Sequence, residues 1–108
     1  MAQLFPVAEL GALRPGATLS VPLADDGVAL FNVGGTVYAL HDGCIRCNAP
    51  LSEGTRNGMR VMCSRCGWDY DIQTGSVCAV PDLRIRSFEV SVVGSKLMLS
   101  VADWASGD

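Results

Sequence analysis

Short runs in which apolar and polar residues alternate cover most of the chain, with turn-forming residues between them. The runs occupy residues 17–23, 27–33, 36–40, 59–63, 87–93 and 96–101. Alternation with a period of two puts every second side chain on the same face of a strand, so each run predicts a β-strand. Helix is predicted for a turn or two at most, within residues 6–16, PVAELGALRPG.

The turn residues between these runs predict hairpins. They are Asp25, Asp26 and Gly27 between the first two runs, then Gly34-Gly35, Asn57-Gly58 and Gly94-Ser95 further along. Such pairs tolerate the positive φ angles of a two-residue hairpin. Many short strands with close turns predict an all-β fold, an antiparallel sandwich or small barrel, formed as one domain over residues 1–108. We expect the tail, residues 103–108, to be frayed.

Composition and charge narrow the class of protein. The chain has 108 residues, of which 49% are hydrophobic and 18% charged, which suits one folded domain. Its net charge of −3 argues against nucleic acid as the main partner. It contains no apolar run long enough to cross a membrane, and its N-terminus does not resemble a signal peptide. We therefore expect a cytoplasmic protein without a membrane partner.

Four of the five cysteines form two Cys-x-x-Cys pairs, Cys44 with Cys47 and Cys63 with Cys66. In a reducing compartment such pairs indicate metal or redox chemistry rather than disulfides. Thiolates are soft ligands that suit zinc or iron. The spacing C-x2-C-x15-C-x2-C alone predicts a zinc site, and four packed thiols are the simplest alternative. The remaining Cys78 is interpreted as a buried small hydrophobe.

The residues that follow each pair suit a tight metal-binding turn. Gly67 follows Cys66, and a residue without a Cβ lets backbone N–H groups approach a sulfur. Asn48 follows Cys47, and asparagine tolerates the left-handed conformation better than most residues. The sequence therefore predicts two similar turns that face one metal.

The flanking segments HDGCIRCNAPLSEG and CSRCGWDYDIQTG resemble the two cluster-binding loops of Rieske-type ferredoxins. In that family, Cys-x-His precedes a Pro-Leu-Ser-x-Gly stretch, and the second loop reads Cys-x-x-His-Gly-Trp. Residues 49–54 match the first pattern, and Gly67, Trp68, Asp71, Thr74 and Gly75 match the second. The resemblance covers roughly residues 3–102. It implies a Rieske-type antiparallel sandwich or barrel with a small two-loop metal-binding subdomain, approximately residues 41–76.

The metal ligands depart from this family. The first family histidine falls on Arg46 and the second on Cys66, while Cys44 and Cys63 match the two cysteine ligands. A further cysteine, Cys47, comes directly after Arg46. The sequence therefore predicts a centre held by Cys44, Cys47, Cys63 and Cys66.

Three centres are compatible with four cysteines. Each loop is a Cys-x-x-Cys, as in rubredoxin, where two knuckles close on a single iron, and this favours mononuclear iron slightly. A [2Fe–2S] cluster is the family's own centre, but two thiolates in place of two imidazoles would add two negative charges to it. Zinc is the third possibility. The only histidine, His41, is not needed as a ligand in any of them.

Neighbouring side chains are candidates for tuning the centre. Arg46 and Arg65 occupy the same place in each knuckle. They are either solvated side chains or cations that favour the reduced, more negative state and so raise the reduction potential. Gly67 and Trp68 are the other candidates for tuning the centre. Trp68 and Tyr70 alternate on a predicted strand and are interpreted as shielding the site or filling the core.

The resemblance implies a one-electron carrier that passes electrons from a flavin-containing reductase to a terminal oxygenase or a similar enzyme. The chain would not be a catalyst alone, since nothing places Glu53, Asp69 and Asp71 around a substrate pocket. Two alternatives remain: a non-redox four-cysteine zinc module, and a small subunit of a larger reductase.

Overall fold

The computed structural model describes residues 3–23 and 26–101. These ranges contain nine strands: β1 (Gln3–Glu9), β2 (Thr18–Leu23), β3 (Asp26–Val33), β4 (Thr36–His41), β5 (Thr55–Asn57), β6 (Arg60–Met62), β7 (Asp69–Asp71), β8 (Ser87–Val93) and β9 (Lys96–Val101). Two 3-10 turns, η1 (Leu10–Ala12) and η2 (Leu51–Glu53), are their only helical segments. The all-β prediction is confirmed. The predicted Asp25 turn position and the tail 103–108 lie outside the described residues.

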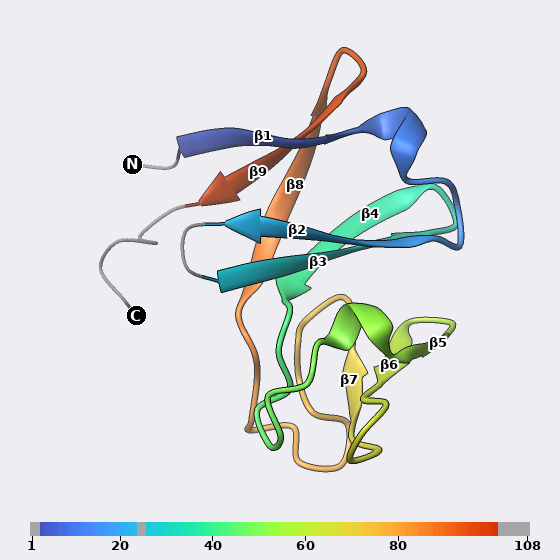
Figure 1. Ribbon diagram of the computed structural model, residues 1–108, viewed down its shortest axis with the longest axis vertical. Coiled ribbons are helices and arrows are strands. Elements are labelled where there is room, and N and C mark those ends of the chain that lie inside the picture. The colour runs from blue at the N-terminus through green and yellow to red at the C-terminus, as the bar shows by residue number, and fades with distance from the viewer. Residues whose placement is uncertain (1–2, 24–25, 102–108) are drawn as a thin grey trace.

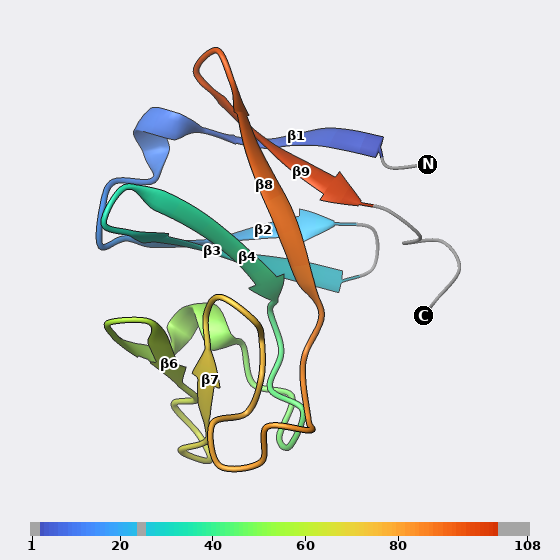
Figure 2. The ribbon, with the colours of Figure 1, turned by 180° about the vertical axis from the view of Figure 1, so that it is seen from behind.

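The strands form two antiparallel sheets. The larger sheet has the order β1-β9-β8-β4-β3-β2, and the smaller has the order β5-β6-β7. The larger sheet curls into a half-barrel, and the smaller one lies beyond one end of it together with η2 (Figure 1). β8 begins beside the smaller sheet and runs to the far end of the half-barrel (Figure 2). The smaller sheet lies within the predicted subdomain, residues 41–76.

The core consists of two clusters that lie on opposite faces of β3. Val28 and Leu30 belong to a cluster on one face, with Leu97 and Leu99 of β9. Ala29 and Phe31 alternate with them and belong to a second cluster on the other face. We call this second cluster the lower core: Ala29, Phe31, Leu40, Cys44, Ala49, Leu51, Val61, Cys63, Tyr70, Ile72, Val77 and Ile85. Burial on both faces explains the unbroken apolar run VALF in β3. The lower core packs the larger sheet against the smaller one.

The first strand differs from the expectation of a helical turn or two at residues 6–16. Residues 3–9 pair with β9 instead, from Gln3 opposite Val101 to Glu9 opposite Lys96. The helical part is the single 3-10 turn η1. Pairing with β9 satisfies the backbone groups of β1 that face this strand, and Pro6 is tolerated because β1 is an edge strand. The long separation between the two strands hides this pairing from a local pattern.

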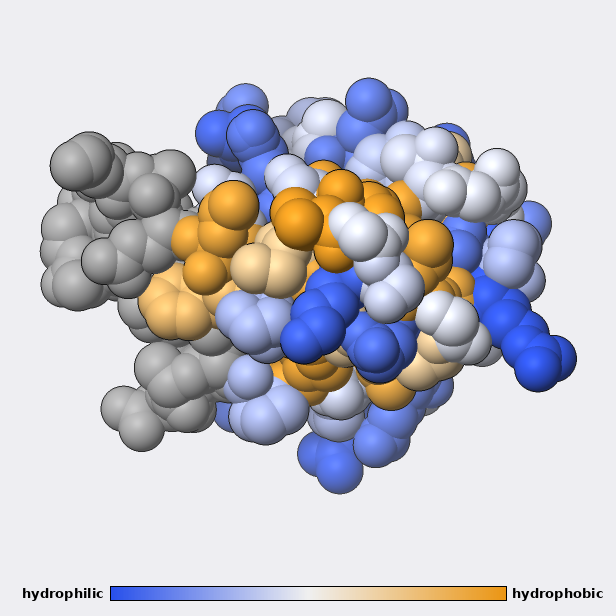
Figure 3. All heavy atoms as spheres, turned by 90° about the horizontal axis from the view of Figure 1, so that it is seen from above, coloured by the Kyte–Doolittle hydropathy of each residue, from blue (hydrophilic) through white to orange (hydrophobic). Residues whose placement is uncertain are grey.

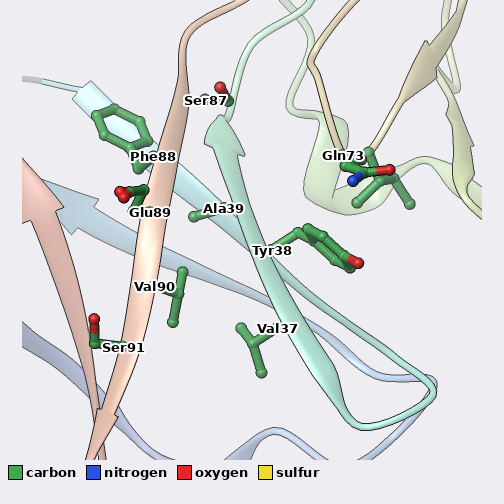
Figure 4. A pocket seen from close by; sticks show the side chains of 10 residues that line it. Val37, Tyr38, Ala39, Gln73, Ser87, Phe88, Glu89, Val90 and Ser91 are labelled. Atoms are coloured by element: carbon green, nitrogen blue, oxygen red, sulfur yellow. The ribbon is translucent and has the colours of Figure 1, made fainter.

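A shallow groove opens where β8 leaves β4. The two strands pair only at Ala39 with Phe88 and Leu40 with Ser87, and β8 then pairs with β9. The groove has a volume of 380 Å³, and its lining includes Tyr38, Phe88 and Glu89 but no cysteine (Figure 4). It is therefore separate from the predicted metal site.

No helix in the described part of the chain is long and apolar enough to cross a membrane.

Candidate metal centre

The first Cys-x-x-Cys pair lies on a tight turn after β4, which we call the first knuckle (residues 44–49). The Asn48 N–H donates to the Cys44 carbonyl oxygen at 2.8 Å, and the Cys44 N–H donates to the Ala49 carbonyl oxygen at 2.9 Å. Asn48 has a φ of 63°, the left-handed conformation expected from the sequence. The backbone therefore closes on itself and leaves both sulfurs on the same side.

The second pair lies on an equivalent turn between β6 and β7, the second knuckle (residues 63–68). The Gly67 N–H donates to the Cys63 carbonyl oxygen at 3.0 Å, and the Cys63 N–H donates to the Trp68 carbonyl oxygen at 2.8 Å. Gly67 has a φ of 79° and takes the place of Asn48. The same turn is thus built twice, once on each loop.

The two knuckles bring four sulfurs together. The Sγ atoms of Cys44, Cys47, Cys63 and Cys66 all lie within 4.8 Å of one another. Two of the separations join the two loops, at 3.5 Å from Cys44 to Cys66 and 3.4 Å from Cys47 to Cys63. Cys44 and Cys63 are buried in the lower core, whereas Cys47 and Cys66 are half-buried. His41 is not part of this group.

Backbone amides surround the sulfurs in the same pattern on each knuckle. The buried sulfur of each pair accepts two amide hydrogen bonds, and the half-buried sulfur accepts one. The donors are Arg46, Cys47 and Ala49 on the first knuckle, and Arg65, Cys66 and Trp68 on the second. Hydrogen bonds from fixed amides stabilise thiolate charge, so the backbone favours an anionic site that attracts a cation.

Tyr70 breaks the equivalence of the two knuckles. Its hydroxyl donates to Cys44 Sγ at 3.1 Å and accepts from the Ile45 N–H at 2.9 Å. The side chain is fully buried, and burial together with the bond to Cys44 raises the pKa of Tyr70 well above its usual range. From the sequence, Tyr70 is interpreted as filling the core or shielding the site. Its contact with a sulfur could not be predicted, because only the fold brings the hydroxyl to Cys44.

The thiols divide into an acidic and a basic set. Burial raises the pKa of Cys44, but hydrogen bonds from Tyr70 and from backbone amides outweigh burial and lower it to about 6. Although the Trp68 amide favours the Cys66 thiolate, burial and neighbouring sulfurs raise the pKa of Cys66 to about 12. Within the Cys44–Cys66 pair, the Tyr70 hydroxyl and the backbone amides therefore favour the thiolate of Cys44 over that of Cys66.

The other predicted residues lie at or near the knuckles. Arg46 and Arg65 are both exposed. The Arg46 guanidinium lies 5.4 Å from the centre of the Trp68 ring, which links the first knuckle to the second. Trp68 is half-buried and packs against the lower core. Cys78 lies outside the sulfur group and is half-buried rather than buried.

Asp42 connects the first knuckle to the half-barrel. Its carboxylate accepts hydrogen bonds at 2.7 Å from Ser20 Oγ of β2 and from both the N–H and the Oγ of Ser52 in η2. Ser52 belongs to the matched segment 49–54, so that motif holds the loop in place. Sequence reasoning missed Asp42, since its partners lie on two separate elements.

We expect Tyr70→Phe to lower the reduction potential of an iron-loaded site by a few tens of millivolts, the equivalent of one modest hydrogen bond. The hydroxyl donates to a sulfur, so it stabilises the extra negative charge of the reduced state. A redox titration of both proteins checks this. Tyr38→Phe serves as the control, because Tyr38 lines the separate groove. An unchanged potential in Tyr70→Phe would show that the hydroxyl does not contact a metal ligand.

Residues 3–97 match the Rieske [2Fe-2S] domain family, so the chain belongs to this family. It is 36% identical over 89 residues to the ferredoxin component of the p-cumate 2,3-dioxygenase system of Pseudomonas putida, covering 80% of this chain and 75% of the relative. It is 32% identical to the 3-phenylpropionate/cinnamic acid dioxygenase ferredoxin subunit of Shigella boydii, covering 70% and 74%.

The fold agrees with this assignment. The ferredoxin of carbazole 1,9a-dioxygenase from Nocardioides aromaticivorans superposes with a TM-score of 0.82 at 27% identity, covering 90% of this chain and 96% of the ferredoxin. The predicted Rieske-type fold is confirmed. The chain is a ferredoxin-type electron carrier and not a catalyst by itself.

The family description implies a [2Fe-2S] cluster, and the donors can be compared with it. Four thiolates suit iron, so the type of ligand fits. Their spacing does not fit two irons. Two irons between the sulfurs would spread the two halves of the site, whereas every pair of sulfurs here lies within 4.8 Å. This arrangement of sulfurs therefore suits a single metal ion better than a two-iron cluster.

Proposed function

We propose that Cys44, Cys47, Cys63 and Cys66 hold a single iron ion, and that the chain uses it to carry one electron at a time. The observation that supports this is the close approach of all four sulfurs, within 4.8 Å. With metal–sulfur bonds of about 2.3 Å, a tetrahedral site has sulfur–sulfur edges of about 3.8 Å. Two separations between the knuckles, 3.4 and 3.5 Å, are already close to that value.

The proposed partners are a flavin-containing reductase as donor and a terminal oxygenase as acceptor. A solved complex of reduced oxygenase and oxidized ferredoxin in carbazole 1,9a-dioxygenase supports the acceptor, since this chain superposes with a TM-score of 0.82 at 27% identity, covering 90% of this chain and 92% of that chain. The ferredoxin components among the relatives support the same role. Free thiols suit a reducing compartment, so a cytoplasmic location belongs to the proposal.

The protein's own groups favour this role. The amides and Tyr70 already point at the sulfurs, so few groups need to move when charge is added to the site. The iron supplies the one-electron redox change. The lower core covers Cys44 and Cys63 and keeps water from that side of the site.

Metal analysis tests the proposal directly. Protein produced in iron-supplemented medium and purified without oxygen should contain about one iron per chain, no acid-labile sulfide, and a visible spectrum that bleaches on reduction. Two irons with labile sulfide would show a [2Fe–2S] cluster instead. Colourless protein that retains only zinc under these conditions would show the non-redox zinc module.

We also expect the reduction potential to be independent of pH between about pH 6 and pH 10, a window that spans shifted imidazole titrations. Imidazole ligands couple electron uptake to proton uptake, but here the ligands are thiolates that bind the metal deprotonated. Redox titrations across this range check the expectation. A slope near one proton per electron would mean that His41 or another protonated group binds the metal.

A further inference from the structure

The four sulfurs are not equally accessible. Cys44 and Cys63 lie in the lower core, whereas Cys47 and Cys66 are half-buried on its outside. Electron transfer between proteins falls steeply with distance. An electron that leaves the site therefore has its shortest way out through Cys47 and Cys66.

The charges beside these two sulfurs have the opposite sign to the whole chain. The net charge is −3, from 8 basic and 11 acidic residues. Each knuckle nevertheless carries an arginine, Arg46 or Arg65, and neither CIRCNA nor CSRCGW contains an acidic residue. Both arginines are exposed, so a partner that approaches the sulfurs meets them first.

The nearest carboxylates along the chain are directed elsewhere. Asp42 is engaged by Ser20 and Ser52 on the side of the half-barrel. Asp69 lines a small groove over β5 and β6 together with Arg60. Neither of them offsets the two arginines at the outer sulfurs.

One of the two arginines is held in place. The Arg46 guanidinium lies over the Trp68 ring at 5.4 Å, a distance at which cation–π attraction acts. Stacking uses the flat face of the guanidinium and leaves its in-plane N–H donors available for a carboxylate. A held arginine loses less conformational entropy on binding than a free one.

We propose that Cys47, Cys66, Arg46, Arg65 and Trp68 form an exit edge, which binds a protein partner that presents carboxylates around its electron-accepting centre. The inference rests on the proposed function and adds the chemistry of the partner. The net charge would favour a basic partner, whereas the exit edge favours an acidic one. Two small redox probes of equal and opposite charge distinguish these cases.

The experiment measures how fast the reduced iron protein is oxidised by hexacyanoferrate(III), a trivalent anion, and by tris(phenanthroline)cobalt(III), a trivalent cation. The rate with the anion divided by the rate with the cation should fall roughly tenfold at low salt in the Arg46→Gln/Arg65→Gln protein. The ratio cancels any change in reduction potential. The control Arg14→Gln removes an exposed arginine of the η1–β2 connection and should leave the ratio within about twofold of the wild type.

A second readout needs no electron transfer. In zinc-loaded protein carrying Trp104→Phe, so that Trp68 is the remaining tryptophan, the ratio of iodide to caesium quenching reports the charge beside the ring. This ratio should fall in the double glutamine variant.

An unchanged ratio in the double variant would overturn the exit edge while leaving the iron carrier intact. Protein that cannot be reduced at all would instead overturn the proposed function. The quenching measurement would then test the charge of the edge by itself, and an unchanged iodide-to-caesium ratio in the double variant would overturn it.

Discussion

Cys47→Ala protein should purify without stoichiometric metal, even from iron-supplemented cells. Four thiolates complete a tetrahedron, and Cys47 Sγ lies 3.4 Å from Cys63 Sγ on the opposite knuckle. Structural metal binding in small thiolate sites contributes about 10–16 kcal/mol. Loss of one ligand in four should therefore lower the affinity by orders of magnitude and loosen both knuckles.

Metal analysis, the visible spectrum and urea denaturation would measure this loss. We expect the same result for alanine at Cys44, Cys63 or Cys66. Cys78→Ser is the matched control, because that thiol is half-buried but lies outside the sulfur group. Full metal content and an unaltered spectrum in Cys47→Ala would show that Cys47 is only a neighbour of the site.

Gly54→Ala should destabilise the protein by about 2–4 kcal/mol, at and above the upper end of the usual cost of overpacking. A Cβ at this position would collide with the carbonyl oxygen of Met62. That oxygen belongs to the backbone of β6, so it cannot rotate away as a side chain would. The collision lies one residue before Cys63, and the second knuckle should shift with it.

Urea denaturation of metal-loaded protein checks the effect of Gly54→Ala. Gly54 has a φ of −77°, which alanine adopts without strain, so the variant tests the collision alone. Gly11→Ala is the control, since a Cβ there meets nothing within 4 Å and its φ is not positive. Equal stability of Gly54→Ala and the wild type would show that β6 yields freely at this contact.

The sequence correctly predicted the elements whose hydrogen-bond partners lie close by along the chain. The runs at 87–93 and 96–101 coincide with β8 and β9, and they are joined by the predicted Gly94-Ser95 turn. The two knuckles followed from the cysteine spacing and from Asn48 and Gly67; the left-handed conformation expected of Asn48 is confirmed, and Gly67 also has a positive φ. In these segments, residues near in sequence supply the partners that fix the backbone.

The features that escaped prediction depend on distant partners. Residues 3–9 are a strand only because β9, some ninety positions later, pairs with them. The Tyr70 hydroxyl reaches Cys44 across 26 positions, and Asp42 reaches Ser20 across 22. No periodicity along the chain records such contacts. The same four cysteines allow one iron or two, so the proposal of a single iron rests on sulfur positions that no pattern along the chain records.

The half-barrel end of the molecule bears on how the protein would behave on an electrode. Leu4 and Phe5 of β1 and Val92 and Val93 of β8 are exposed. Figure 3 shows apolar atoms gathered on this end, while the knuckles lie at the other end of the longest axis, whose extent is 37 Å (Figure 1). On graphite, adsorption through the apolar end would hold the sulfurs outward, with slow exchange to the electrode. A negatively charged surface that attracts the arginines would hold the sulfurs inward, so the current should depend on which surface is used.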